Sequence, residues 1–211
     1  SQANNVTTGV IYQSVISKER KGEYLGETVQ VIPHITDEIK HRIKMLAVKG
    51  NLDFLITEIG GTVGDIESLP FIESVRQLRW EMGKNSVVVH LTLVPFLAAA
   101  GELKTKPTQH SVKMLQEQGV QPDIIVCRTD RPLNEGLRNK IALFCNVNPT
   151  SVIECIDAES IYDVPILMKE ENLDLEILKK VKLEYKNGLD LDSWKAFLHR
   201  LKNPVHQVNI G

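Results

Sequence analysis

Short apolar runs alternate along this chain with segments in which apolar residues recur every three or four positions. The apolar runs are typical of strands, and the run at residues 86–94 is rich in β-branched residues, as in strands buried on both faces. We therefore predict strands at residues 28–32, 53–58, 86–94, 123–127 and 151–155.

The segments between these runs have the periodicity of helices. Thr36 is suited to cap a helix whose buried stripe includes Ile39 and Ile43, with Gly50 as its natural end. Further helices are predicted at residues 69–82, 108–118 and 137–145, and beyond Pro165, where Trp194, Phe197, Leu198 and Leu201 form a packing stripe. Residues 1–29 give no clear assignment.

Strands that alternate with helices predict βαβ units with right-handed crossovers. The fold class expected is therefore α/β, a three-layer Rossmann-like arrangement around a mostly parallel sheet. His90 lies inside one apolar run, where a hydrogen-bonded core histidine is a simpler interpretation than a functional one.

Composition narrows the possible functions. The chain has 211 residues, 42% of them hydrophobic, and a net charge of -2. Such a chain has a sizeable core, no basic surface suited to nucleic acid, and no apolar run long enough for a membrane span. The three cysteines lack CxxC spacing and indicate reduced thiols, so we expect a cytoplasmic protein.

Residues 58–67, here named the acidic segment, combine three carboxylates with three glycines. They follow the predicted strand 53–58, and ligands of open α/β sheets sit beyond the carboxyl ends of strands. Glu58 there is suited to a Mg²⁺ ion carried by a phosphorylated ligand. A tight turn whose acids, Asp65 and Glu67, cap the next helix explains the same pattern, and the residues alone leave both open.

Residues 104–109, here named the basic segment, hold two lysines around Thr105, followed by Pro107 and by Thr108 as a helix cap. Paired cations at a helix start can hold a polyphosphate, although an exposed basic loop has the same pattern. Lys140 stands among apolar neighbours and fits either a site or a snorkelling side chain.

Four blocks occur in an order that resembles one enzyme family. They are Gly26–Thr36 (GETVQVIPHIT), Glu58–Ser68 (EIGGTVGDIES), Lys104–Gln109 (KTKPTQ) and Lys140–Asn146 (KIALFCN). Together they resemble the amidoligase (synthetase) domain of the CTP synthase family. The resemblance implies a sheet of the P-loop NTPase, dethiobiotin synthetase-like type, and residues 1–203 as part of that domain. Residues 204–211 resemble the start of a linker to a glutaminase domain.

The family resemblance implies ATP-dependent amination of UTP to CTP. ATP phosphorylates the uracil 4-oxygen, and ammonia from a glutaminase domain displaces that phosphate. It implies Mg²⁺ held by Glu58, a CTP feedback segment at Asp65, Ile66 and Glu67, and a homotetramer. It further assigns catalytic lysines (Lys104, Lys106, Lys140), a loop shared by UTP and CTP (Lys104, Thr105, Lys106, Pro107, Thr108, Gln109, with Lys140), and an ATP-binding group (Ile156, Asp157, Ala158, Arg128). Gln30 and His34 match a segment along the pyrimidine and ammonia path.

Some family features have no counterpart in this sequence. The chain contains no GxxxxGK[ST] motif and no glutaminase triad, so we expect a part of the enzyme that is inactive alone. Ile156 stands where a basic residue is common in the family, which weakens the adenine assignment there. Lys21 stands where arginine is frequent, a milder departure that costs bidentate geometry. One alternative is a non-catalytic module that binds pyrimidine nucleotides or supports assembly. Another is a relative of the partitioning-type P-loop ATPases. The basic segment and the CTP feedback segment at Asp65–Glu67 argue against this second alternative.

Overall fold

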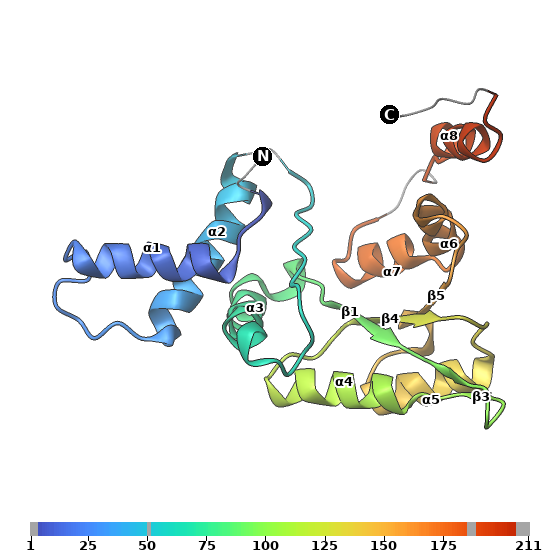
Figure 1. Ribbon diagram of the computed structural model, residues 1–211, viewed down its shortest axis with the longest axis horizontal. Coiled ribbons are helices and arrows are strands. Elements are labelled where there is room, and N and C mark those ends of the chain that lie inside the picture. Colours follow the sequence, from blue (N-terminus) through green and yellow to red (C-terminus); the bar gives the residue numbers. More distant parts are fainter. Residues whose placement is uncertain (1–3, 50–51, 185–188, 206–211) are drawn as a thin grey trace, which may run out of the picture. The chain divides into compact units, whose positions relative to one another are not determined.

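The computed structural model describes residues 4–49, 52–184 and 189–205 (Figure 1). These form two compact units, residues 1–86 with 113–121 and residues 87–112 with 122–211. The helices are α1 (Thr8–Arg20), α2 (Thr36–Lys49), α3 (Leu69–Met82), α4 (Lys106–Glu117), α5 (Glu135–Cys145), α6 (Val164–Glu170), α7 (Leu173–Lys180) and α8 (Asp192–Lys202). The strands are β1 (Val89–Leu93), β2 (Phe96–Leu97), β3 (Glu102–Leu103), β4 (Ile124–Thr129) and β5 (Val152–Ile156).

The first unit is helical, and its core lies between α1 and α2. Ile11 and Val15 on α1 pack with Ile35 and Ile39. The α1 helix occupies residues that the sequence left unassigned, although Thr7 is its N-cap and accepts a hydrogen bond from the backbone N–H of Val10. The spacing of Ile11 and Val15, one helical turn, was the signal that could have predicted it.

A buried carboxylate also joins α1 to α2. Glu38 accepts hydrogen bonds from Lys18 on α1, at 2.5 Å, and from Nε of Arg42 on its own helix, at 2.9 Å. Only 3% of its side chain is exposed. Burial acts to raise the pKa of Glu38, but hydrogen bonds from Lys18, Arg42 and Ser14 outweigh it and lower the pKa to about 2. The hydrogen bonds that join α1 to α2 at this point therefore stabilise the ionised form of Glu38.

The α3 helix has the predicted bounds. Pro70 lies in its first turn, where no backbone N–H is needed, and Gly83 follows its last residue with φ 54°. The predicted end of α2 at Gly50 lies outside the described residues.

Two predicted strands of the first unit are wrong. Residues 28–30 form no strand and lead into a π-helical turn at Val31–Ile35, and residues 54–58 form no strand either. Phe54, Leu55 and Ile56 are 49%, 37% and 94% exposed, so this apolar run does not lie in a buried sheet. An apolar run of this length indicates that burial is possible but does not supply a partner strand.

The second unit contains a parallel sheet in the order β1-β4-β5. Val89 pairs with Ile124 and Ile125 pairs with Val152, so the strands run in the same direction and end at the same edge. The strands predicted at 86–94, 123–127 and 151–155 are confirmed, each with bounds shifted by a few residues. A short antiparallel hairpin, β2-β3, follows β1.

Helices cover both faces of this sheet, as Figure 1 shows for α5 and α6–α7. On one face, Ile125 and Cys127 of β4 pack with Val112 of α4 and Ile141 of α5. On the other, Ile124 and Val126 of β4 pack with residues of α6 and α7, Met168 and Ile177 among them. This is the three-layer α/β arrangement predicted from the sequence.

The strand β1 differs from the central strand β4. Val89, Leu91 and Leu93 are exposed, whereas His90 and Thr92 on the opposite face are buried. The expectation that this run is buried on both faces is therefore wrong: on the face of Val89, Leu91 and Leu93 the residues of α6 and α7 pack against β4 and β5, and these three side chains are not part of that cluster. No helix of the described residues is long and apolar enough to cross a membrane.

Candidate functional site

The basic segment links the β2-β3 hairpin to α4. The backbone N–H of Lys104 donates to the carbonyl of Pro95 at 2.9 Å, and α4 begins at Lys106, two residues before the predicted start. Pro107 lies in the first turn of α4, where proline is tolerated. Lys106 is exposed and Lys104 is half-buried. Both cations lie at the N-terminus of α4.

The other polar side chains of the basic segment point inward. Thr105, Thr108 and Gln109 are 3%, 0% and 9% exposed. The side-chain amide of Gln109 donates to Thr105 Oγ1 at 3.0 Å, and the hydroxyl of Thr108 donates to the carbonyl of Leu93 at 3.0 Å. Thr108 is therefore not the N-cap predicted from sequence. The segment presents lysines outside and a buried polar support inside.

Glu102 lies against the cations of this region. It forms an ion pair with Lys104, and its pKa is lowered first by the hydrogen bond from Lys104, then by the charges of Lys104 and Lys140. Lys140, on α5, is exposed and lies close enough for its charge to act on the same carboxylate. Lys104 is therefore paired with Glu102, whereas Lys140 acts on this carboxylate only through its charge.

The predicted adenine group lies at the carboxyl edge of the sheet. Arg128 stands near the end of β4, and its Nε donates to Oδ1 of Asp157, just after β5, at 3.1 Å. The backbone N–H of Asp157 donates to the carbonyl of Thr129 at 2.9 Å, which extends the strand pairing by one residue. Asp157 is exposed, whereas Ile156 and Ala158 are half-buried. In open α/β sheets this edge is where ligands bind.

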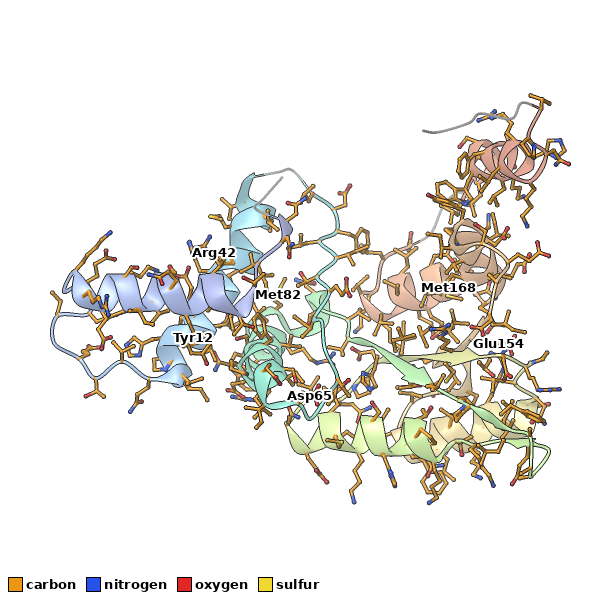
Figure 2. All side chains as sticks on the ribbon, in the orientation of Figure 1. Tyr12, Arg42, Asp65, Met82, Glu154 and Met168 are labelled. Carbon is orange, nitrogen blue, oxygen red and sulfur yellow. The ribbon has the colours of Figure 1, made fainter. Side chains whose placement is uncertain are left out.

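An ionic cluster supports β5 from within. Arg138 on α5 donates to the carboxylate of Glu171 at 2.7 and 2.9 Å and to the carbonyl of Val152 at 2.9 Å. Glu171 also accepts a hydrogen bond, at 2.8 Å, from the backbone N–H of Glu154 on β5, a residue labelled in Figure 2. Hydrogen bonding to Glu171 raises the pKa of Arg138. The cluster holds β5, and hence the position of Asp157, relative to α5.

The acidic segment belongs to the first unit and is an exposed loop. Glu58, Asp65, Ile66 and Glu67 are exposed, and Figure 2 labels Asp65 just before α3. Gly64 has φ 104°, and a Cβ atom there would lie 1.9 Å from Cε of Met114. Glycine is therefore favoured at this position by the backbone conformation, whereas the flexible end of the Met114 side chain could move away from a Cβ atom.

The loop is closed by Ser68. The Ser68 hydroxyl reaches the carbonyls of Thr62 and Asp65, at 3.1 and 2.9 Å. These two contacts fix the end of the acidic segment next to α3, whereas residues 54–58 carry no such anchor among the described residues.

The carboxylate of Glu58 is predicted to bind Mg²⁺, and its surroundings show which kind of magnesium site it suits. No group of three or more His, Cys, Asp or Glu side chains that could hold a metal occurs among the residues the structure describes. Mg²⁺ is commonly bound through one or two carboxylates together with substrate phosphates rather than by a complete protein cage. The exposed carboxylate of Glu58 fits that mode and does not fit a resident metal centre.

Gln30 and His34 lie together beside the turn at Val31–Ile35. The backbone N–H of Gln30 donates to Nδ1 of His34 at 3.0 Å, and Tyr24 packs edge-on against the histidine ring at 4.7 Å between centroids. This contact fixes the orientation of the ring.

Comparison with known proteins decides the family. A family model described as CTP synthase N-terminus matches residues 1–183. This chain belongs to the CTP synthase family. A CTP synthase of Cytophaga hutchinsonii is 66% identical over 212 aligned positions, and one of Bacteroides thetaiotaomicron is 59% identical over 216, each match covering the whole of this chain. The chain spans 39–40% of the length of these relatives.

Sequence reasoning missed several residues that shape these regions. Thr92, Glu102 and Arg138 lie outside the four family blocks. Thr92 contacts Thr108 and Glu102 contacts Lys104, both in the basic segment, and Arg138 donates to the carbonyl of Val152 on β5, the strand that leads to Asp157. A lone hydroxyl inside the apolar run at 86–94 was the available signal for Thr92. The partner of Glu102, Lys104, is placed by the hairpin, and the partner of Arg138, Glu171, is distant in sequence. No local pattern indicated either contact.

Proposed function

We propose that this chain is the nucleotide-binding part of a CTP synthase, a ligase of pyrimidine biosynthesis that aminates UTP to CTP with ATP and glutamine-derived ammonia. The observation that carries the proposal is the pair of lysines, Lys104 and Lys106, at the N-terminus of α4, above the buried side chains of Thr105 and Thr108. Cations and helix N-terminal amides are the groups that recognise a polyphosphate.

In this proposal the residues have separate tasks. Lys104, Lys106 and Lys140 neutralise the triphosphate shared by UTP and CTP, and the α4 amides orient it. Arg128 and the segment Ile156–Ala158 lie beside the adenine of ATP. Asp65, Ile66 and Glu67 contribute to feedback binding of CTP.

Phosphorylation of the uracil 4-oxygen needs charge neutralisation and alignment more than covalent chemistry by the protein. Mg²⁺, when bound with ATP, supplies part of that neutralisation, and Glu58 is the residue that would hold it. We further propose a cytoplasmic homotetramer as the assembled enzyme, as the family resemblance implies.

The test uses the complete CTP synthase that we propose contains this chain. Lys106→Ala removes one cation from an exposed position, and Lys195→Ala, on the surface of α8, is the matched control. Charge-assisted contacts contribute about 1.5–3 kcal/mol, so KM for UTP is expected to rise roughly 10- to 100-fold, with a smaller change for ATP. Steady-state kinetics with each nucleotide varied measures this.

Three results would count against the proposal. Equal losses for UTP and ATP would contradict the assignment of the basic segment. An equal effect of Lys195→Ala would show that surface charge alone is responsible. Nucleotide binding without any CTP formation by the complete protein would favour a non-catalytic binding module.

A further inference from the structure

A buried pair of hydroxyls connects β1 to the start of α4. Oγ1 of Thr108 lies 3.1 Å from Oγ1 of Thr92. Thr108 is fully buried and Thr92 is 6% exposed, so neither hydroxyl has ready access to solvent. Such groups are strongly held in place, because leaving one unpaired inside the protein is unfavourable.

The pair fixes the helix start against the end of a strand. The Thr108 hydroxyl donates to the carbonyl of Leu93, the last residue of β1, at 3.0 Å. Thr92 lies within hydrogen-bond range of Val126 O on β4, at 3.5 Å, and of Sγ of Cys127, at 3.8 Å. The connection therefore runs from the central strand through β1 to the first turn of α4, where Lys106 stands.

We propose that Thr92 and Thr108 act together as positioning residues for triphosphate recognition. In this role Thr108 does not touch the nucleotide, although it lies inside the segment assigned to UTP and CTP. Its hydroxyl is directed to β1, and the two lysines that precede it, Lys104 and Lys106, make the contacts. Thr92, which belongs to no nucleotide-binding block, holds Thr108. This inference rests on the proposed function of the basic segment.

A second polar contact between the same two elements provides the control. One turn further along α4, Ser111 Oγ lies 2.8 Å from Nε2 of His90 on β1. This contact also joins α4 to β1, but it lies beyond the basic segment. Loss of the Ser111 hydroxyl is expected to reduce stability without moving the lysines.

The experiment compares Thr92→Val, Thr108→Val, the double variant, Thr108→Ser and Ser111→Ala in the complete CTP synthase, with Lys106→Ala as reference. Valine keeps the shape of threonine and removes the hydroxyl. We expect KM for UTP to rise about three- to tenfold in Thr108→Val and by a smaller factor in Thr92→Val, with kcat and KM for ATP nearly constant. Thr108→Ser should restore KM to within about twofold. The double variant should show less than the product of the two single effects, because both act through one contact.

The outcomes separate the possible roles. A large effect of Thr108→Val with none from Thr92→Val would overturn the proposal in favour of direct contact with the nucleotide. Equal loss of thermal stability in Thr92→Val, Thr108→Val and Ser111→Ala, with KM for UTP unchanged in these three variants, would overturn it in favour of a purely structural role. If Lys106→Ala itself leaves UTP binding intact, the proposed function of the segment fails, independently of the threonine pair.

Discussion

The basic and acidic segments are both assigned to nucleotide binding by family resemblance, yet the fold treats them differently. In the basic segment Thr105, Thr108 and Gln109 are buried and hydrogen-bonded, so the two lysines stand on a fixed support. In the acidic segment the carboxylates are exposed, and the described anchor is the Ser68 hydroxyl, which contacts the carbonyls of Thr62 and Asp65. The fold therefore holds the basic segment along its length and holds the acidic segment mainly at its end next to α3.

The largest expected effect sets two isoleucines against each other. Ile125 on β4 is 0% exposed, and Ile56, just before the acidic segment, is 94% exposed. Ile125→Ala is expected to lower the free energy of unfolding by about 2–5 kcal/mol, because it leaves a cavity in the core. Ile56→Ala should change it by less than about 0.5 kcal/mol. Urea denaturation of both variants measures the difference, and a destabilisation of more than about 2 kcal/mol by Ile56→Ala would restore the predicted buried strand.

A smaller effect contrasts a buried carboxylate with an exposed one. The folded pKa of Glu38, about 2, lies below its ordinary value of 4.5, so its stabilisation is present above pH 4.5 and is lost as the pH falls toward 2. The shift corresponds to at most about 3 kcal/mol. Glu38→Gln should therefore destabilise the protein at pH 7 and reduce the loss of stability between pH 4.5 and 2.

Glu67→Gln is the matched control for Glu38→Gln, because Glu67 is exposed in the acidic segment. It should leave the unfolding free energy within about 0.5 kcal/mol at either pH. Thermal denaturation across the pH series distinguishes the two. Identical pH profiles for wild type and Glu38→Gln would show that Glu38 titrates normally.

The smallest effect tests the acidic segment in its proposed role. In the complete enzyme, Glu67→Gln is expected to raise the inhibition constant for CTP about three- to tenfold, a change of roughly 1 kcal/mol, and to raise KM for UTP less. Inhibition kinetics at several UTP concentrations provides both constants. A parallel rise in the two would assign Glu67 to the shared triphosphate site.

The sequence predicted best where local signals and burial agree. Pro70 and Gly83 mark the ends of α3, and the buried runs around Ile125 and Ile153 become strands with helices on both faces. It failed at residues 54–58, because an apolar run contains no information about a partner strand. It placed the lysines of the basic segment on a helix start but could not reveal the Thr92–Thr108 pair, which depends on the packing of α4 against β1.

The register of the parallel sheet also has a consequence for the order in which the chain folds. The backbone N–H of Val88 donates to the carboxylate of Asp123, 35 residues away, so joining β1 to β4 closes a loop that contains the hairpin and α4. The α1–α2 contacts of the first unit close much shorter loops; Lys18 and Glu38 are 20 residues apart. Because loop closure opposes long-range pairing before any contact compensates for it, the helices of the first unit are expected to form early and the sheet late. The support of the basic segment, which joins α4 to β1, would then be among the last features to reach its native geometry.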